Sequence, residues 1–180
     1  MRILALCGSL RARSSNRAAL EAAMLLAPPG MTITLFDGLA ALPYFNPDLD
    51  EDPPAPVLAL RQAIGAADGL LICSPEYARG VAGVLKNALD WLVGAFEFPE
   101  KPVAVINASP RATHADAALR LTLETMSARL VAEASITLPL LGRNLDAAGI
   151  VADPELAAAL QAALERFLAG GVQPFGTGAG

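Results

Sequence analysis

Short apolar runs alternate with segments of helical periodicity along this chain. The runs at residues 3–6, 31–36, 70–73 and 103–106 are bounded by polar, Gly or Pro residues, which is typical of strands in a sheet. A fifth run, at residues 131–138, is predicted to be a strand as well. Apolar positions recur at helical spacing in residues 17–27, 57–66, 81–92, 115–129 and 154–168. The pattern therefore predicts five strands that alternate with helices.

Strands separated by helices pair in parallel through right-handed crossovers. The predicted fold is therefore α/β, a doubly wound sheet of five parallel strands with helices on both faces. In such a sheet the loops after the first, third and fourth strands lie along the carboxyl edge, where ligands bind. With the strand order 2-1-3-4-5, Cys7 and Cys73 end adjacent strands, and we interpret them as unreactive thiols with apolar neighbours.

The first of these loops, residues 8–16, reads GSLRARSSN and leads into a helix. Hydroxyls, backbone N–H groups and arginines at a helix start suit a phosphate group. The alternative is a solvated turn in which Ser14 or Ser15 caps the helix. The loop lacks the later glycines of a dinucleotide-binding fingerprint and the lysine of a P-loop. The fourth strand also opens into a polar loop, where Ser109 or Thr113 is the expected helix cap.

Composition narrows the classes of function. With 180 residues, 54% of them hydrophobic, the chain suits one domain with a substantial core. A formal net charge of −5 with only 13 Lys and Arg residues argues against a nucleic-acid partner. No apolar run approaches the roughly 20 residues that span a bilayer, so we expect a cytoplasmic protein without a membrane partner. One histidine and two separated cysteines predict no metal site.

Two groups of aromatic residues are open to two interpretations. Residues 37–56 form a long irregular segment rich in Pro, Asp and Gly, and Tyr44 and Phe45 lie within it. These two rings either cover a ligand or a partner subunit, or pack in a small satellite core under the segment. Trp91, Phe96 and Phe98 follow the central helix and either form an apolar patch for a partner or close the core.

Given these residues, the chain resembles the NADPH-dependent FMN reductase family, a flavodoxin-like group that includes quinone, chromate and azo reductases. The resemblance covers residues 2–168 and rests on GSLR with Ser14 and Asn16, on PEY at 75–77 with GVLKNALDW at 83–91, and on Ser-Pro at 109–110. It implies a flavodoxin-like three-layer domain at residues 1–169, followed by a flexible tail at 170–180. It also implies a homodimer or homotetramer.

The resemblance further implies FMN as cofactor and NADPH or NADH as electron donor. The implied function is an FMN-dependent NAD(P)H oxidoreductase that reduces a small acceptor, namely a quinone, chromate, an azo compound or free flavin. The alternative is an FMN-binding electron carrier that does not oxidise NAD(P)H. Because the flavin carries the chemistry, no catalytic protein residue is expected. The implied cofactor-binding residues are Ser9, Arg11, Ser14, Ser15, Asn16, Pro75, Glu76, Tyr77, Ala78 and Ser109.

The chain departs from the family after Tyr77. Members often carry Asn-Gly-Ser or a similar run there, whereas this chain has Ala78, Arg79 and a glycine, so one side-chain amide contact to the flavin edge is missing. Arg79 then either lies near the N1–O2 edge of the flavin, reaches a phosphate of the nicotinamide cofactor, or points into water. Arg13, Arg79 and Arg111 are all candidates to bind a 2′-phosphate.

Overall fold

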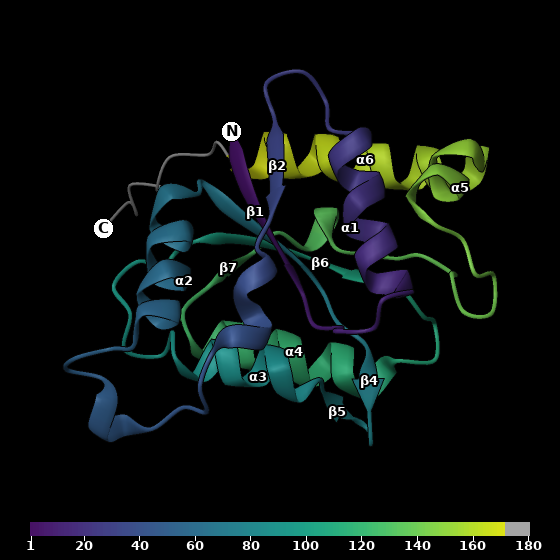
Figure 1. Cartoon of the computed structure of the whole chain (residues 1–180). Coiled ribbons are helices and arrows are strands. Elements are labelled where there is room, and N and C mark those ends of the chain that lie inside the picture. Colours follow the sequence, from purple (N-terminus) through teal and green to yellow (C-terminus); the bar gives the residue numbers. More distant parts are fainter. Residues whose placement is uncertain (172–180) are drawn as a thin grey trace.

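The computed structural model describes residues 1–171, which form a central sheet covered by helices on both faces (Figure 1). The strands follow the order β2-β1-β3-β6-β7, β8 also pairs with β6, and every pair is parallel. This confirms the predicted order 2-1-3-4-5. The strands are β1 (Arg2–Cys7), β2 (Thr32–Leu35), β3 (Gly69–Cys73), β6 (Pro102–Asn107), β7 (Arg129–Leu130) and β8 (Ile136–Thr137).

The helices form two layers, each with its own apolar core. One face of the sheet packs against α1 (Ser15–Leu25), α5 (Ala147–Ala152) and α6 (Pro154–Gly171), and the other against α2 (Ala55–Ala66), α3 (Gly83–Asp90) and α4 (Thr113–Thr125). Alternate residues of β1 divide between the two cores, because successive side chains of a strand point to opposite faces. Burial on both faces explains why the strands read as apolar runs. None of the helices in the described part of the chain is long and apolar enough to cross a membrane.

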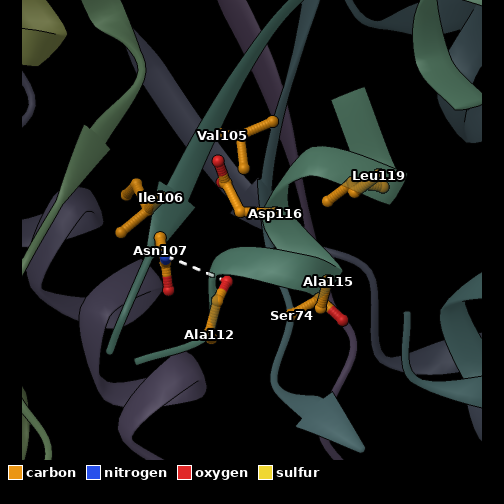
Figure 2. Close-up of a pocket in the computed structure, with 8 residues that line it drawn as sticks. All are labelled: Ser74, Val105, Ile106, Asn107, Ala112, Ala115, Asp116 and Leu119. Atoms are coloured by element: carbon orange, nitrogen blue, oxygen red, sulfur yellow. Dashed lines mark hydrogen bonds between the residues drawn. The ribbon is translucent and has the colours of Figure 1, made fainter. Parts of the chain in front are cut away.

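A small cavity lies between β6 and the start of α4 (Figure 2). Its volume of about 10 Å³ leaves room for roughly one water molecule. This cavity is therefore too small for a larger ligand. The lining residues are Ser74, Val105, Ile106, Asn107, Ala112, Ala115, Asp116 and Leu119.

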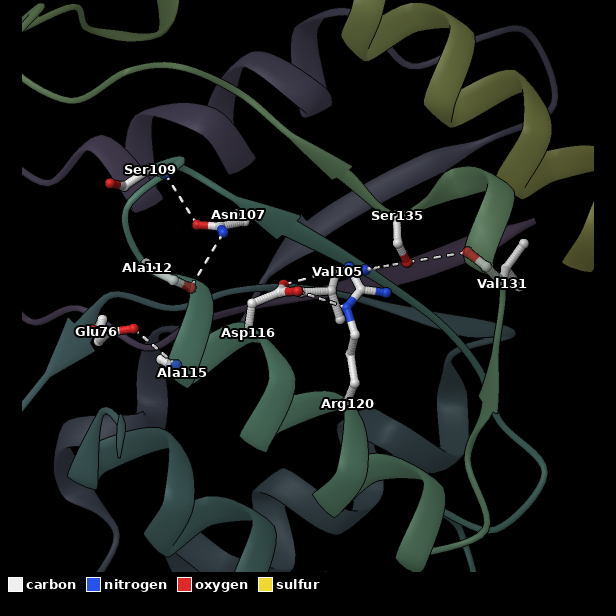
Figure 3. A network of polar contacts seen from close by, with 10 residues as sticks. All are labelled: Glu76, Val105, Asn107, Ser109, Ala112, Ala115, Asp116, Arg120, Val131 and Ser135. Carbon is white, nitrogen blue, oxygen red and sulfur yellow. Dashed lines mark hydrogen bonds and ion pairs between the residues drawn. The ribbon is translucent and has the colours of Figure 1, made fainter. Parts of the chain in front are cut away.

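The fifth strand differs from the prediction of one strand at residues 131–138. The structure has two short strands, β7 and β8, separated by the 3-10 helix η3 (Ala132–Ala134). Ser135 explains why the interruption is tolerated (Figure 3). Its hydroxyl accepts a hydrogen bond from Val105 N at 3.1 Å and donates one to Val131 O at 3.1 Å, so a side chain replaces the missing ladder contact of β6.

Helix boundaries also differ in places. Helix α4 ends at Thr125 rather than at residue 129, since Ser127 adopts a left-handed conformation with φ 61°. Helix α5 was not predicted, and Asp146 starts it by accepting a hydrogen bond from Gly149 N at 2.8 Å. Helix α6 continues to Gly171, so the first two residues of the expected tail are helical. The rest of that expected tail, residues 172–180, lies outside the described residues.

The irregular segment at residues 37–56 contains two 3-10 helices, η1 (Asp37–Ala41) and η2 (Pro47–Leu49), and is fixed to α3. Pro43 O accepts hydrogen bonds from Asn87 Nδ2 at 2.9 Å and from Trp91 Nε1 at 2.8 Å. The Phe45 ring meets Trp91 edge to face, with ring centroids 5.0 Å apart. Phe45 therefore belongs to a satellite core, whereas Tyr44 is 92% exposed.

The aromatic residues after α3 differ in burial. Trp91 and Phe98 are both fully buried. Phe98 belongs to the core on the α2, α3 and α4 side, whereas Trp91 packs against Phe45. Phe96 is 98% exposed.

Candidate functional site at the carboxyl edge of the sheet

The loop between β1 and α1 is folded around its own polar side chains. Ser9, Ser14 and Asn16 are all buried, with exposed fractions of 8%, 8% and 9%. Ser9 Oγ accepts a hydrogen bond from Arg11 N at 3.4 Å. Ser14 is the N-cap of α1, since its Oγ accepts a hydrogen bond from Arg17 N at 3.3 Å. The predicted cap is confirmed for Ser14.

Most backbone N–H groups of this loop have no acceptor in the described part of the chain. Within residues 1–171, those of Leu10 and of residues 12–16 donate to no other residue. They include Ser15 and Asn16 at the start of α1, where free N–H groups and the helix dipole favour an anion. Arg11 is exposed beside them. Capping and phosphate binding are therefore compatible in this loop, and its donors fit a phosphate group.

Gly8 allows the first and third loops to touch. Its N–H donates to Cys73 O at 2.8 Å. A Cβ at this position would lie 2.3 Å from Ser74 Oγ and 2.8 Å from Ser74 Cβ, closer than atoms can approach. The close approach of the two backbones therefore requires glycine here.

The two cysteines lie directly beneath the first loop. Cys7 and Cys73 are paired in register on β1 and β3, which confirms that they end adjacent strands. Cys73 Sγ donates to Asn16 Oδ1 at 3.3 Å and Cys7 Sγ donates to Ser9 O at 3.5 Å. Burial raises the pKa of both thiols, and it raises that of Cys73 well above its ordinary value. Both groups therefore stay protonated and serve as donors that orient the loop.

The third loop contains a hairpin that the sequence did not predict. Strands β4 (Glu76–Tyr77) and β5 (Gly80–Val81) pair antiparallel, and Tyr77 opposite Gly80 leaves a two-residue tip. Ala78 and Arg79 form this tip with φ 49° and 60°, in the left-handed region where Asn and Gly are usual. The half-exposed Tyr77 helps to line an open pocket of about 410 Å³ together with Gly8, Leu10, Arg11, Ala82, Gly83 and Val84.

Glu76 joins the third loop to the fourth. Its Oε2 accepts a hydrogen bond from Ala115 N, in the first turn of α4, at 2.9 Å (Figure 3). The N-cap residue Ala112 offers no side-chain acceptor. The prediction that Ser109 or Thr113 caps this helix is therefore wrong, because the acceptor comes from a loop 39 residues earlier. The Glu76 carboxylate is thereby fixed as a structural contact of the site.

Asn107 orders the loop after β6. It is 7% exposed, its Oδ1 accepts a hydrogen bond from Ser109 N at 3.0 Å, and its Nδ2 donates to Ala112 O at 3.4 Å (Figure 3). Ser109 Oγ accepts from Arg111 N at 3.2 Å, so this loop is folded on itself. Asn107 was not among the residues predicted to form the site. The available signal was a polar residue at the end of an apolar strand.

All ten expected cofactor-binding residues lie in the three segments that follow β1, β3 and β6 at one edge of the sheet, because these strands are adjacent and parallel. Ser15 and Asn16 are in the first turn of α1, and Glu76 and Tyr77 are in β4. The structure directly joins the first loop to the third through Gly8, and the third to the fourth through Glu76. Pro75 is half-buried between these contacts, and Ser109 is half-buried as well. The edge thus offers hydrogen-bond donors for an anion at the first loop and an apolar, aromatic surface at the third.

Comparisons with known proteins agree with this arrangement. The family model of NADPH-dependent FMN reductases matches residues 1–139. An NAD(P)H-dependent FMN reductase from Pseudomonas aeruginosa is 46% identical over 113 residues, which are 61% of this chain and 60% of that protein. A 2-hydroxy-1,4-benzoquinone reductase from a Burkholderia species is 41% identical over 112 residues, 61% of each chain. This chain thus spans about three fifths of the length of these curated relatives.

A solved structure shares nearly the whole fold. The flavoenzyme FerB, an NAD(P)H:(acceptor) oxidoreductase from Paracoccus denitrificans, superposes with a TM-score of 0.80 at 30% identity. The superposition covers 93% of this chain and 95% of that one.

Proposed function

The chain belongs to the NADPH-dependent FMN reductase family, and from this premise we propose that it is an FMN-dependent NAD(P)H oxidoreductase. It takes electrons from NADPH or NADH and passes them to a small acceptor, namely a quinone, chromate, an azo compound or free flavin. The observation that carries the proposal is the first loop, where Ser9 and Ser14 are buried and neighbouring backbone N–H groups have no acceptor within the described chain.

Each loop has a distinct role in this proposal. The N–H groups of residues 12–16, the Ser9, Ser14 and Ser15 hydroxyls and the Arg11 guanidinium hold the FMN phosphate. Asn16 is oriented for the same purpose, since its Oδ1 is occupied by Cys73 and its Nδ2 donates to no residue of the described chain. When bound, FMN supplies hydride acceptance and electron transfer, so this chain needs no nucleophile of its own.

The ring of the cofactor is held by the other two loops. Backbone groups of residues 75–78 and the loop at Ser109 would border it, and the Tyr77 side chain, which lines the pocket, would supply an apolar contact. The Glu76 carboxylate acts indirectly, because it fixes the hairpin against α4. A donor and an acceptor that use the same open site in turn would give parallel lines in a double-reciprocal plot. Intersecting lines would contradict alternating use of one face.

The proposal extends to domain, assembly and location. Residues 1–169 form the reductase domain, and the protein is a homodimer or homotetramer. Support for assembly comes from exposed apolar side chains: Leu10, Tyr44, Tyr77 and Phe96 are 63%, 92%, 52% and 98% exposed. A cytoplasmic location suits the two free, buried thiols Cys7 and Cys73, because thiols stay reduced there.

The test is an absorbance spectrum after incubation with FMN and desalting, followed by anaerobic addition of NADPH and then of NADH. We expect a retained flavin spectrum that bleaches on addition of the donor. Retained flavin that does not bleach with either donor would favour an electron carrier. If no flavin is retained at high loading, the cofactor assignment is wrong.

A further inference from the structure

Four arginines at the carboxyl edge of the sheet have no partner in residues 1–171. Arg11, Arg13, Arg79 and Arg111 are exposed, and their side chains form no ion pair or hydrogen bond there. All four lie in the three loops of the candidate site. The other cationic side chains of the chain each hold a carboxylate or a backbone carbonyl: Arg2, Arg17, Arg61, Lys86, Lys101, Arg120, Arg129, Arg143 and Arg166.

This distribution is unusual for an acidic chain with a net charge of −5. Residues 8–16, 74–80 and 108–112 contain a single carboxylate, Glu76, and it already accepts a hydrogen bond from Ala115. Unpaired charges of one sign along one edge raise the local potential for anions. A phosphate in the first loop makes use of Arg11 and the free N–H groups. The positive charge of the other two loops is then left for a different anion.

Arg79 adopts a backbone conformation that is unfavourable for a residue with a Cβ atom. The hairpin tip holds Ala78 and Arg79 in the left-handed region, which residues with a Cβ disfavour and which Asn-Gly adopts without strain. Backbone strain of this kind persists where the surrounding structure enforces it, and it is common at functional sites. The strained tip carries an exposed arginine two residues after Tyr77, which lines the open pocket.

Arg79 and Arg111 stand on elements that are fixed to each other. Strands β4 and β5 pack against α4, and the hydrogen bond from Ala115 N to Glu76 locks that contact (Figure 3). Arg111 lies just before α4 begins, in the loop that Asn107 orders. The backbone segments that carry the two arginines thus belong to one packed part of the edge, separate from the loop between β1 and α1.

We propose that Arg79 and Arg111 form a subsite for an anionic group of the second substrate, outside the phosphate-binding loop. This inference rests on the proposed function. The group is an oxyanion, either the 2′-phosphate of NADPH or an acidic group on the acceptor, because the planar guanidinium fork matches such oxygens in pairs. The subsite makes the enzyme prefer NADPH to NADH, or anionic acceptors to neutral ones.

The test compares Arg79→Ala and Arg111→Ala with the unaltered protein. Steady-state rates are measured with NADPH and NADH, and with 1,4-naphthoquinone and its 2-sulfonate as acceptors. We expect kcat/KM for the anionic member of one pair to fall about tenfold or more through KM, with the neutral member unchanged. Loss in the donor pair identifies the 2′-phosphate, and loss in the quinone pair identifies the acceptor. Arg79→Lys should retain only part of the kcat/KM for the anionic member, since lysine keeps the charge without the planar fork of donors.

Two controls make the result specific. Arg166→Ala removes a positive charge whose partner is Glu133 O, outside the three loops. It should change neither the ratio of kcat/KM for NADPH to that for NADH nor the ratio for the two quinones. The FMN dissociation constant should be the same in every variant. Unchanged ratios in both Arg79→Ala and Arg111→Ala would overturn the subsite. Weaker FMN binding in these variants would overturn it as well, because the arginines would then hold FMN rather than the second substrate.

The subsite and the proposed function fail in distinguishable ways. If the FMN-loaded protein oxidises neither NADPH nor NADH, the proposed function is wrong. The subsite is then judged by calorimetric binding of adenosine 2′,5′-bisphosphate against adenosine 5′-monophosphate, and of the two quinones. Weaker binding of an anionic probe to Arg79→Ala supports the subsite. If the unaltered protein binds the two members of each pair equally, the subsite is wrong.

Discussion

Glu76 Oε2 and Ala115 N lie 2.9 Å apart, and this contact gives α4 a cap from another loop. Glu76→Ala removes it, and we expect a loss of about 1 kcal/mol in the free energy of unfolding, as for other lost N-caps. FMN affinity should fall as well, because the hairpin is no longer held against α4. Urea unfolding and fluorescence titration of FMN measure the two effects.

Glu76→Gln is the matched control for this contact. It keeps an acceptor oxygen and removes only the charge, so we expect it to retain most of the stability and affinity. If Glu76→Gln is as damaging as Glu76→Ala, the charge rather than the hydrogen bond holds the loops together.

Gly8→Ala tests the close approach of the first and third loops. The new Cβ would meet Ser74 Oγ at 2.3 Å and Ser74 Cα at 3.1 Å, so the backbone must move. We expect a loss of about 1–3 kcal/mol in the free energy of unfolding, typical of overpacking, together with weaker FMN binding. Adding Ser74→Gly should recover part of both, since it removes the atoms that clash. Gly83→Ala has no neighbour within 4 Å and should cost nothing, which thermal melts can check.

Ser14 separates capping from phosphate binding. Ser14→Asp keeps a good N-cap for α1, so the free energy of unfolding should change by no more than about 0.5 kcal/mol. The carboxylate would repel the FMN phosphate at the same N–H groups, and we expect FMN to bind roughly 100-fold more weakly. Ser14→Ala should show the opposite balance, with about 1 kcal/mol less stability and a smaller loss of affinity. Equal FMN affinity in Ser14→Asp would place the phosphate elsewhere.

The sequence predicted the sheet because its strands are buried on both faces, and such strands read as apolar runs at any position in the chain. It failed where distant residues decide the local structure. Ser135 replaces a ladder hydrogen bond of Val105, so the fifth apolar run is broken although its composition suits a strand. The cap of α4 comes from Glu76, and no local pattern contains it.

In the candidate site, too, the parts set by contiguous residues could be predicted and the parts set by distant contacts could not. The first loop could be predicted, because its hydroxyls, arginines and helix start are contiguous in the sequence. The role of Cys73 in orienting Asn16 depends on strand register, which the apolar pattern alone leaves open. The hairpin with Ala78 and Arg79 at its tip lacks the Asn-Gly signal that usually reveals such a turn.

Asn87 fixes the segment at residues 37–56 to α3. Its Oδ1 accepts a hydrogen bond from Phe45 N at 2.8 Å, and its Nδ2 donates to Pro43 O at 2.9 Å. Asn87→Ala should lower the free energy of unfolding by about 1–3 kcal/mol, for two lost hydrogen bonds. Chymotrypsin should then cleave faster beside Tyr44, which is already exposed. Asn87→Asp keeps only the acceptor, so its stability and cleavage rate should lie between those of the unaltered protein and Asn87→Ala. Unchanged cleavage would mean that the Trp91 contacts alone hold the segment.

The buried thiols predict how stability changes at high pH. Burial raises the pKa of Cys73 well above 9.0 in the folded state, whereas the unfolded thiol ionises near 9.0. The folded state therefore keeps its proton longer, and the thiol's contribution to stability is complete below pH 9 and is lost as the pH rises towards the folded pKa. The free energy of unfolding should fall by about 1.4 kcal/mol per pH unit for each thiol that ionises only on unfolding.

Cys73→Ser isolates this effect, because a hydroxyl does not titrate in this range and can still donate to Asn16. Under reducing conditions, urea unfolding from pH 8 to 10.5 should show a shallower loss of stability in Cys73→Ser than in the unaltered protein. Ellman's reagent should modify Cys7 and Cys73 slowly before unfolding and rapidly after it, since attack requires a thiolate and access. Rapid modification of the folded protein at pH 8 would show that the thiols are neither buried nor protonated, and the orientation of Asn16 by Cys73 would then need another explanation.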